Sequence, residues 1–199
     1  EALSPKTLPK KILIIGGGVI GMELGSFYQH LGTEVTVVEY MDQIIPGVEP
    51  DIVKVVHRRA KKAGIKIHTK AAAKGWREHG DGVIVEVEVN GKLKEFAADL
   101  ILLTVGRRPL LPEGLDSVGL SPDQRGFLPT DEHCATACAG VWAIGDICHG
   151  PMLAHKGSAE GLVAAAAICG KPGANWDYQV VPGVIFTDPE IATVGMTEA

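Results

Sequence analysis

Hydrophobic positions in the first 110 residues alternate between a strand pattern and a helical pattern. Short apolar runs are typical of buried strands, whereas apolar residues that recur every three or four positions predict amphipathic helices. Strands that alternate with helices favour a parallel sheet, so we expect a small doubly wound α/β domain. The predicted strands cover residues 11–15, 35–39, 65–69 and 100–105, and the predicted helices run from the first glycine-rich turn to residue 31 and over residues 51–63.

An antiparallel hairpin is predicted inside this domain, around Asn90-Gly91. This dipeptide is a strong signal for a two-residue hairpin turn. Valines at 83, 85, 87 and 89 would share one face of the first strand, with Glu86 and Glu88 on the other.

The second half of the chain is less regular. Residues 107–139 are rich in Pro, Gly, Asp and Arg, which is typical of connecting segments. The apolar run 141–144 predicts a last buried strand, and the alanine-rich stretch 155–168 predicts a helix packed closely against a neighbour. From Val180 the chain resembles the opening strand of a further region.

Composition and charge exclude several classes of function. The 199 residues are 46% hydrophobic and 22% charged, with a net charge of −5. A mildly acidic chain without a basic cluster argues against a nucleic-acid partner. The apolar segment 162–169 is too short to cross a bilayer, and the first ten residues do not resemble a signal peptide. We therefore expect no membrane association and a cytoplasmic location.

Cysteine, histidine and tryptophan positions give no sign of a metal or a nucleic-acid site. The cysteines match no zinc or thioredoxin-like spacing, so we expect reduced, structural thiols. No histidine clusters with carboxylates at metal-ligand spacing, and we predict no metal site. The tryptophans are expected in the core, because no basic residues interleave with them. These residues are Cys134, Cys138, Cys148, Cys169, Trp76, Trp142 and Trp176.

A dinucleotide-binding fingerprint follows the first strand directly, at residues 16–21. Gly16 permits the tight turn, Gly18 lets the backbone approach a pyrophosphate, and Gly21 lets the helix pack closely on the strand. The N–H groups at the start of the helix would face the phosphates. The alternative is a glycine turn that only packs a helix onto a sheet.

Glu39 is predicted to determine the specificity for NAD or NADP. It ends the second strand, where a carboxylate can accept hydrogen bonds from the 2′- and 3′-hydroxyls of a ribose. The same carboxylate would repel a 2′-phosphate, and the next residues are Tyr40 and Met41 rather than arginine. We therefore expect NAD rather than NADP.

A second constellation begins at Gly145-Asp146, after the predicted strand 141–144. A helix is predicted to begin about eight residues later, at Leu153-Ala154-His155. An aspartate there can hold a cofactor hydroxyl, and a helix N-terminus favours nearby negative charge. By local chemistry alone, a Gly-Asp dipeptide after a strand is more often a simple turn.

Taken in order, these motifs resemble those of the pyridine nucleotide–disulfide oxidoreductases, over essentially the whole chain. Within that family, Met-Leu-Ala-His-Lys together with Glu39 favours the lipoamide branch. The series consists of Gly16 to Glu23, Glu39, Gly106-Arg107-Arg108-Pro109, Ala143-Ile144-Gly145-Asp146, Met152-Leu153-Ala154-His155-Lys156 and Pro189-Glu190-Ile191-Ala192 with Val194, Gly195, Thr197 and Glu198.

The resemblance implies three regions and two cofactors. Residues 1–110 would form a three-layer, Rossmann-like NAD-binding domain with the inserted hairpin, residues 111–180 the C-terminal part of an FAD-binding domain, and residues 181–199 the start of a dimerisation domain. The implied NAD residues are Gly16, Gly17, Gly18, Val19, Ile20, Gly21, Met22 and Glu23 around the pyrophosphate and towards the nicotinamide, Glu39 at the ribose, Ala71 near the adenine and Gly106 beside the NAD. The implied FAD residues are Asp146 at the ribityl and pyrophosphate, and Met152, Leu153, Ala154 and His155 along the flavin.

The implied activity is the oxidation of dihydrolipoamide, carried on a lipoyl domain of a 2-oxo-acid dehydrogenase complex. Electrons would pass through a disulfide and FAD to NAD in a homodimeric enzyme. This sequence carries neither the family's FAD fingerprint, nor its Cys-x-x-x-x-Cys pair, nor its His–Glu base. We therefore expect an internal portion that binds NAD(H) without turnover and holds no catalytic residue.

Two pairs in the sequence imitate the missing parts. Cys134 and Cys138 are separated by one residue fewer than the family's redox pair. His155 and Glu160 have the family's His–Glu spacing, but residues five apart point away from each other around a helix. We expect neither pair to be catalytic. The alternative functions are another FAD reductase, such as a mercuric reductase or NADH oxidase relative, and a non-catalytic NAD-binding module.

Overall fold

The computed structural model describes residues 2–171, 173 and 175–196. The chain divides into two compact units: the first comprises Glu1–Gly106 and Val184–Ala192, and the second comprises Arg107–Gly183 and Thr193–Ala199. Thr197 and Glu198, which end the family-like series, lie outside the described residues. In the described part of the chain, no helix is both long and apolar enough to cross a membrane.

A parallel sheet forms the centre of the first unit, and the α/β prediction is confirmed. Its strand order is β3-β2-β1-β7, and each neighbouring pair is parallel. The strands are β1 (Lys11–Ile15), β2 (Glu34–Val38), β3 (Lys66–His68) and β7 (Leu100–Leu103), and the helices of this unit are α1 (Val19–His30) and α2 (Pro50–Lys62).

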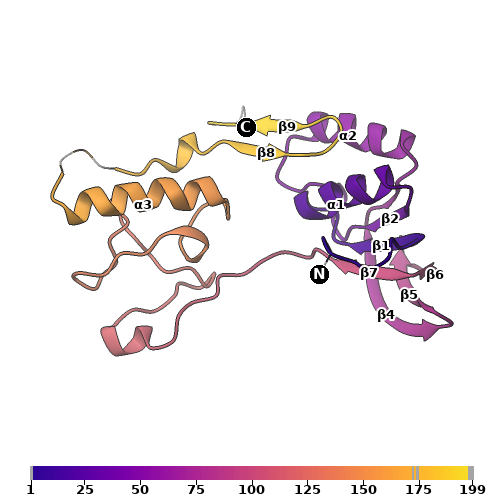
Figure 1. Ribbon diagram of the computed structural model, residues 1–199, viewed down its shortest axis with the longest axis horizontal. Helices are drawn as coiled ribbons and strands as arrows, with labels where there is room; N and C mark the ends of the chain where they lie inside the picture. The colour runs from indigo at the N-terminus through magenta and orange to yellow at the C-terminus, as the bar shows by residue number, and fades with distance from the viewer. Residues whose placement is uncertain (1, 172, 174, 197–199) are drawn as a thin grey trace. The chain divides into compact units, whose positions relative to one another are not determined.

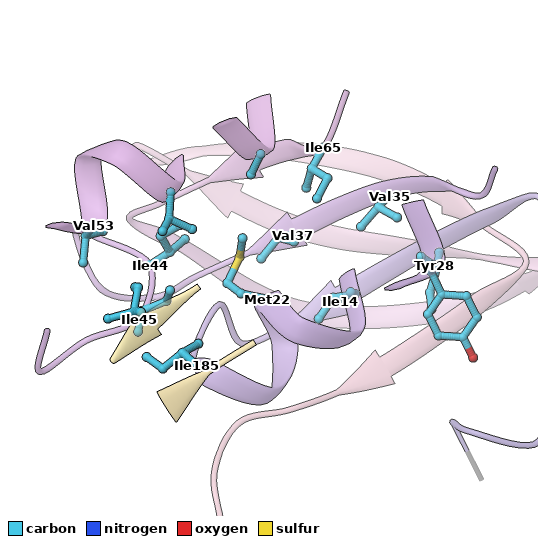
Figure 2. Close-up of a cluster of buried hydrophobic side chains, with 14 residues drawn as sticks. Ile14, Met22, Tyr28, Val35, Val37, Ile44, Ile45, Val53, Ile65 and Ile185 are labelled. Atoms are coloured by element: carbon cyan, nitrogen blue, oxygen red, sulfur yellow. The ribbon is translucent and has the colours of Figure 1, made fainter. Parts of the chain in front are cut away.

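Alternate residues of β1 face two different layers. Ile12 and Ile14 pack into the cluster with the helix side chains, whereas Leu13 and Ile15 pack against the second sheet, as the two-residue period of a strand requires. Figure 1 shows α1 and α2 on one face of the parallel sheet and the antiparallel strands on the other. In Figure 2, Met22 of α1 lies against Val37 of β2 inside the larger cluster.

The second layer is a three-stranded antiparallel sheet and not the expected hairpin. It consists of β4 (Ala71–His79), β5 (Gly82–Val89) and β6 (Lys92–Ala98). The turn predicted at Asn90-Gly91 is present, with φ of 51° and 74°. The sequence pattern missed β4 because its first residues are alanines and a bulge between Ala73 and Gly75 breaks the alternation. Trp76 on this strand is 64% exposed, so its predicted core position is wrong.

The second unit has little regular structure apart from one long helix, α3 (Ala154–Ile168). This helix confirms the prediction for residues 155–168. A small cluster that includes Leu120, Leu128, Ala143 and Cys148 forms the unit's core. The described residues of this unit also form the short 3-10 helices η1 (Leu115–Val118), η2 (Gly145–Ile147) and η3 (Tyr178–Val180).

The buried strand predicted at residues 141–144 is wrong. An isolated antiparallel bridge joins Ala135 to Trp142 there, and Ile144 is 40% exposed. An apolar run becomes a strand only when a neighbour supplies the backbone hydrogen bonds, and the described residues of this unit supply only that bridge. Trp142 and Trp176 are only partly buried and do not occupy the core positions predicted for them.

The last two strands, β8 (Gly183–Ile185) and β9 (Ile191–Thr193), pair with each other. Ile185 and Ile191 join the helix-side core of the first unit, and Figure 2 shows Ile185 beside Ile45. Arg59 of α2 forms an ion pair with Asp188 at 3.1 Å. Residues 184–192 therefore belong to the packing of the first unit.

Candidate functional site

The glycine-rich turn links β1 to α1, and two of its glycines are required by the fold. Gly16 has φ of +105°, and a Cβ there would lie 2.5 Å from the Thr104 carbonyl oxygen. A Cβ on Gly21 would lie 2.0 Å from the Gly16 carbonyl oxygen. Both distances are far inside van der Waals contact, so a larger residue would force the turn, the helix and β7 apart.

Gly18 differs from these two glycines. Its φ is −69°, an ordinary value for any residue, and it is the N-cap of α1. Among the described residues, no heavy atom lies within 4 Å of a Cβ built at this position. The fold therefore does not require glycine here, and the absence of a side chain leaves the backbone open to an approaching group.

A cavity of about 490 Å³ opens beside the turn, at the carboxyl ends of β1, β2 and β7. This edge of a parallel sheet is where ligands bind in α/β folds. Five of the expected NAD residues line the cavity: Gly16, Gly18, Glu39, Ala71 and Gly106. Ala71 reaches it from the start of β4, and Thr104 lines the wall that follows β7.

Glu39 is buried, at 6% exposure, and both of its carboxylate oxygens accept backbone hydrogen bonds. Oε2 accepts the Gly17 N–H at 2.6 Å, and Oε1 accepts the Met41 N–H at 2.7 Å. Gly17 is close-packed on the same residue, since a Cβ there would lie 3.1 Å from Glu39 Cβ. The carboxylate is thus held in one orientation at the edge of the cavity.

Thr104 is a site residue that the sequence analysis missed. Its hydroxyl donates to the Gly16 carbonyl oxygen at 2.7 Å, with a longer contact of 3.2 Å to the Ile15 carbonyl oxygen. Its backbone N–H donates to Ile15 O at 2.8 Å. A single threonine after an apolar strand matches no motif, so only its position beside the turn identifies it.

The remaining expected NAD residues do not line the cavity: Gly17 lies in the turn, and Val19, Ile20, Gly21, Met22 and Glu23 lie on α1. Met22 is fully buried in the core, whereas Val19 and Ile20 are 39% and 43% exposed. The Glu23 carboxylate accepts the Phe186 N–H at 2.8 Å. Residues 184–192 therefore reach the helix that begins at the glycine turn.

In the second unit, Asp146 and Met152 are brought together by Arg107. The carboxylate of Asp146 lies 3.4 Å from Arg107 Nη1 and is half exposed. Arg107 Nη2 donates to the Met152 carbonyl oxygen at 2.6 Å. This ties the turn at Gly145-Asp146 to the segment that leads into α3.

A buried ion pair on α3, Lys156 with Glu160, supports the same turn and was not predicted. Lys156 Nζ lies 3.0 Å from Glu160 Oε1 and donates to the carbonyl oxygens of Gly145 at 2.9 Å and His149 at 3.2 Å. Glu160 Oε2 accepts the Gly145 N–H at 2.7 Å. A Lys and a Glu four residues apart on the same face as Ala164 are the signal that would have indicated the pair.

Tyr178 completes this buried cluster. Its hydroxyl donates to Glu160 Oε1 at 3.2 Å. Burial, reinforced by the negative charge of Glu160, raises the pKa of the Tyr178 hydroxyl. The hydroxyl therefore stays protonated and remains a donor to the carboxylate.

His155 and Glu160 have different partners, and Cys134 and Cys138 are not bonded to each other. His155 is exposed, and its Nε2 lies 2.7 Å from the Pro182 carbonyl oxygen, whereas Glu160 is buried against Lys156. All four cysteines, each within the described residues, are free thiols. Burial, and secondly the charge of Glu160, raises the pKa of Cys134 to about 11. A thiol with that pKa holds little thiolate, the reactive form, at neutral pH.

A parallel sheet with a glycine-rich turn at the start of its first helix is typical of dinucleotide-binding α/β domains. Residues 1–161 match the model of the pyridine nucleotide-disulphide oxidoreductase family. The chain belongs to this family, whose members use FAD and NAD(H).

Among the curated relatives, the chain is 50% identical over its whole length to dihydrolipoyl dehydrogenase of Bacillus subtilis, and 46% identical to that of Haloferax volcanii. It spans 42% of the length of each.

Two solved structures are also similar. LpdA from Mycobacterium tuberculosis has a TM-score of 0.89 and 28% identity, over 96% of this chain and 41% of that one. The HOCl-induced flavoprotein disulfide reductase RclA from Escherichia coli has a TM-score of 0.87 and 26% identity, over 98% and 45%.

Proposed function

We propose that the first unit binds NAD(H) in the cavity beside the glycine turn. The observation that carries this proposal is the open space at Gly18. Gly16 and Gly21 are explained by the fold, but Gly18 has an ordinary φ and open space around a Cβ. A glycine that the fold does not need, at the start of a helix and facing a cavity, suits the close approach of a pyrophosphate.

Glu39 would select NAD over NADP. Each carboxylate oxygen already accepts one backbone N–H, and each keeps a second lone pair for a ribose hydroxyl. A 2′-phosphate would place negative charge against a buried carboxylate, which is unfavourable. Tyr40 and Met41, which follow it, are largely exposed and offer no positive charge.

The second unit would contribute to an FAD site in the whole protein. Bound FAD would supply electron transfer between a disulfide and NAD, and Asp146 with residues 152–155 would face it. The half-exposed Asp146 carboxylate suits hydroxyl recognition, and Arg107 suits a phosphate. In this assignment, residues 1–110 are the NAD-binding domain, 111–180 are part of the FAD-binding domain and 181–199 begin the interface domain.

The whole protein would oxidise dihydrolipoamide on a lipoyl domain of a 2-oxo-acid dehydrogenase complex and reduce NAD, as a cytoplasmic homodimer. Support comes from relatives named dihydrolipoyl dehydrogenase at up to 50% identity over the full chain. The 199-residue chain by itself would bind NAD(H) without turnover, because no two of its cysteines have the Cys-x-x-x-x-Cys spacing.

The test is a fluorescence titration of the 199-residue chain with NADH and NADPH, beside Gly18→Ala. We expect NADH to bind more tightly than NADPH. The added methyl group would crowd the pyrophosphate at a cost of about 1–3 kcal/mol, which raises the NADH Kd roughly 5- to 150-fold. Alanine is less favourable than glycine at the N-cap of a helix, so the free energy of unfolding should fall by no more than about 1 kcal/mol.

The matched control is Gly75→Ala. Gly75 also has open space around a Cβ, measured against the described residues, but it lies on β4 outside the cavity. It should change neither affinity nor stability. Absence of NADH binding to the folded wild type, or wild-type affinity in Gly18→Ala, would contradict the NAD(H) site. Formation of NADH from dihydrolipoamide by this chain would contradict the predicted lack of turnover.

A further inference from the structure

We propose that Thr104 is a positioning residue of the NAD(H) site, because it and Glu39 together fix the peptide group between Gly16 and Gly17. This inference rests on the proposed NAD(H) function. Thr104 would not need to touch the nucleotide. Its role would be to hold the turn in the one conformation in which the backbone that follows can face a pyrophosphate.

The two side chains bind opposite ends of the same peptide group. The carbonyl oxygen of Gly16 accepts from the Thr104 hydroxyl at 2.7 Å, and the N–H of Gly17 donates to Glu39 Oε2 at 2.6 Å. In a trans peptide, the C=O and N–H point in opposite directions within one plane. Partners on both sides therefore fix the orientation of that plane.

This peptide needs external support because of the residues that form it. Gly16 and Gly17 have no side chains to restrict φ and ψ, so their backbone has more accessible conformations than any other pair would have. The first N–H groups of a helix obtain no partner within the helix. Their direction at the start of α1 depends on the turn that precedes them, so a rotated Gly16–Gly17 peptide would misdirect the donors.

Thr104 comes from a different part of the chain than the fingerprint. It lies 88 residues from Gly16 in sequence, directly after β7, and its own N–H donates to Ile15 O. β7 pairs with β1 over Ile12 to Ile15. The pairing of β7 with β1 therefore places the Thr104 hydroxyl beside the turn.

The experiment compares Thr104→Val, Thr104→Ala and Thr104→Ser by NADH titration of the 199-residue chain. Valine replaces the hydroxyl with a methyl group that would crowd Gly16 O, and alanine removes the hydroxyl without adding bulk. Loss of one hydrogen bond at the turn should raise the NADH Kd about three- to tenfold in both variants. Serine keeps the hydroxyl and should keep wild-type affinity.

Thr33→Val is the matched control. Its hydroxyl also donates to a backbone carbonyl, Pro9 O at 2.8 Å, and it is 4% exposed, but it precedes β2 and does not line the cavity. The same kind of hydrogen bond is lost there, so its NADH affinity should remain that of the wild type. Circular dichroism checks that every variant is folded.

The outcomes separate this inference from the proposed function. If the folded wild type binds no NADH, the NAD(H) site itself is wrong. If the wild type binds and Thr104→Ala binds equally well, only the positioning role is overturned. Weak binding by Thr104→Ser would also overturn it, since the lost methyl group and not the hydroxyl would then be responsible. Equal weakening by Thr33→Val would show a general loss of stability instead.

Discussion

At Glu39, a carboxylate and its amide are not interchangeable. Both oxygens accept backbone N–H groups, one from Gly17 and one from Met41, in a buried position. A glutamine offers a single acceptor oxygen, and its NH₂ group would face one of these donors. The proposed recognition of the ribose and the support of the glycine turn would therefore depend on the same negative group.

We predict that Glu39→Gln both weakens NADH binding and destabilises the first unit. One N–H group is left facing another donor in a buried site, which costs about 1–3 kcal/mol. The measurements are NADH titration and urea unfolding. Glu34→Gln is the control, because Glu34 is half exposed and pairs with Lys66 at the surface. Wild-type stability and affinity in Glu39→Gln would show that its two backbone contacts are unimportant.

At the scale of a single element, α3 buries a stripe that is charged at two of its three positions. Lys156, Glu160 and Ala164 are the buried residues of this helix, four positions apart. The pair satisfies the N–H and C=O of Gly145 as well as each other. The helix therefore fixes the turn that carries Asp146 by electrostatic contacts more than by apolar packing.

We predict strong coupling within this pair. Lys156→Met or Glu160→Leu alone leaves an uncompensated buried charge and should destabilise the second unit by about 3–5 kcal/mol. The double variant should cost clearly less than the sum of the two, because no charge remains buried. Urea unfolding of all three variants forms a double-mutant cycle. Ser158→Ala, on the exposed side of α3, is the control, and additive effects would argue against a coupled pair.

At the scale of the whole molecule, each unit has its own core. The first is built on the parallel sheet and the second on the cluster around Leu128 and Cys148. Every residue that lines the proposed NAD(H) cavity belongs to the first unit. Ligand binding should therefore stabilise one unit selectively.

We predict that NADH slows amide hydrogen exchange in peptides from β1, α1 and residues 100–106, and leaves α3 unchanged. At a ligand concentration of 100 Kd, binding stabilises the liganded unit by about 2.7 kcal/mol. Exchange measured by mass spectrometry with and without NADH tests this, with Gly18→Ala as the variant that should gain less protection. Equal protection of α3 would contradict a site confined to the first unit.

The parallel sheet, its two helices and the glycine turn could all be predicted from the sequence. These features depend on local rules: the period of apolar residues, the φ that only glycine adopts easily at Gly16, and the Asn90-Gly91 turn. The motifs also indicated the family, which the comparisons confirm. Each of these signals lies within a short stretch of chain.

Features whose partners lie far apart in sequence could not be predicted in this way and are seen only in the three-dimensional fold. Residues 141–144 have a strand-like pattern but only a single bridge, and β4 has a poor pattern but a paired neighbour in β5. Thr104 became part of the site because β7 pairs with β1, although 88 residues separate it from Gly16. Strands, buried charges and tight turns all need hydrogen-bonding or charged partners from other segments of the chain. A local sequence pattern does not show which distant segment supplies that partner.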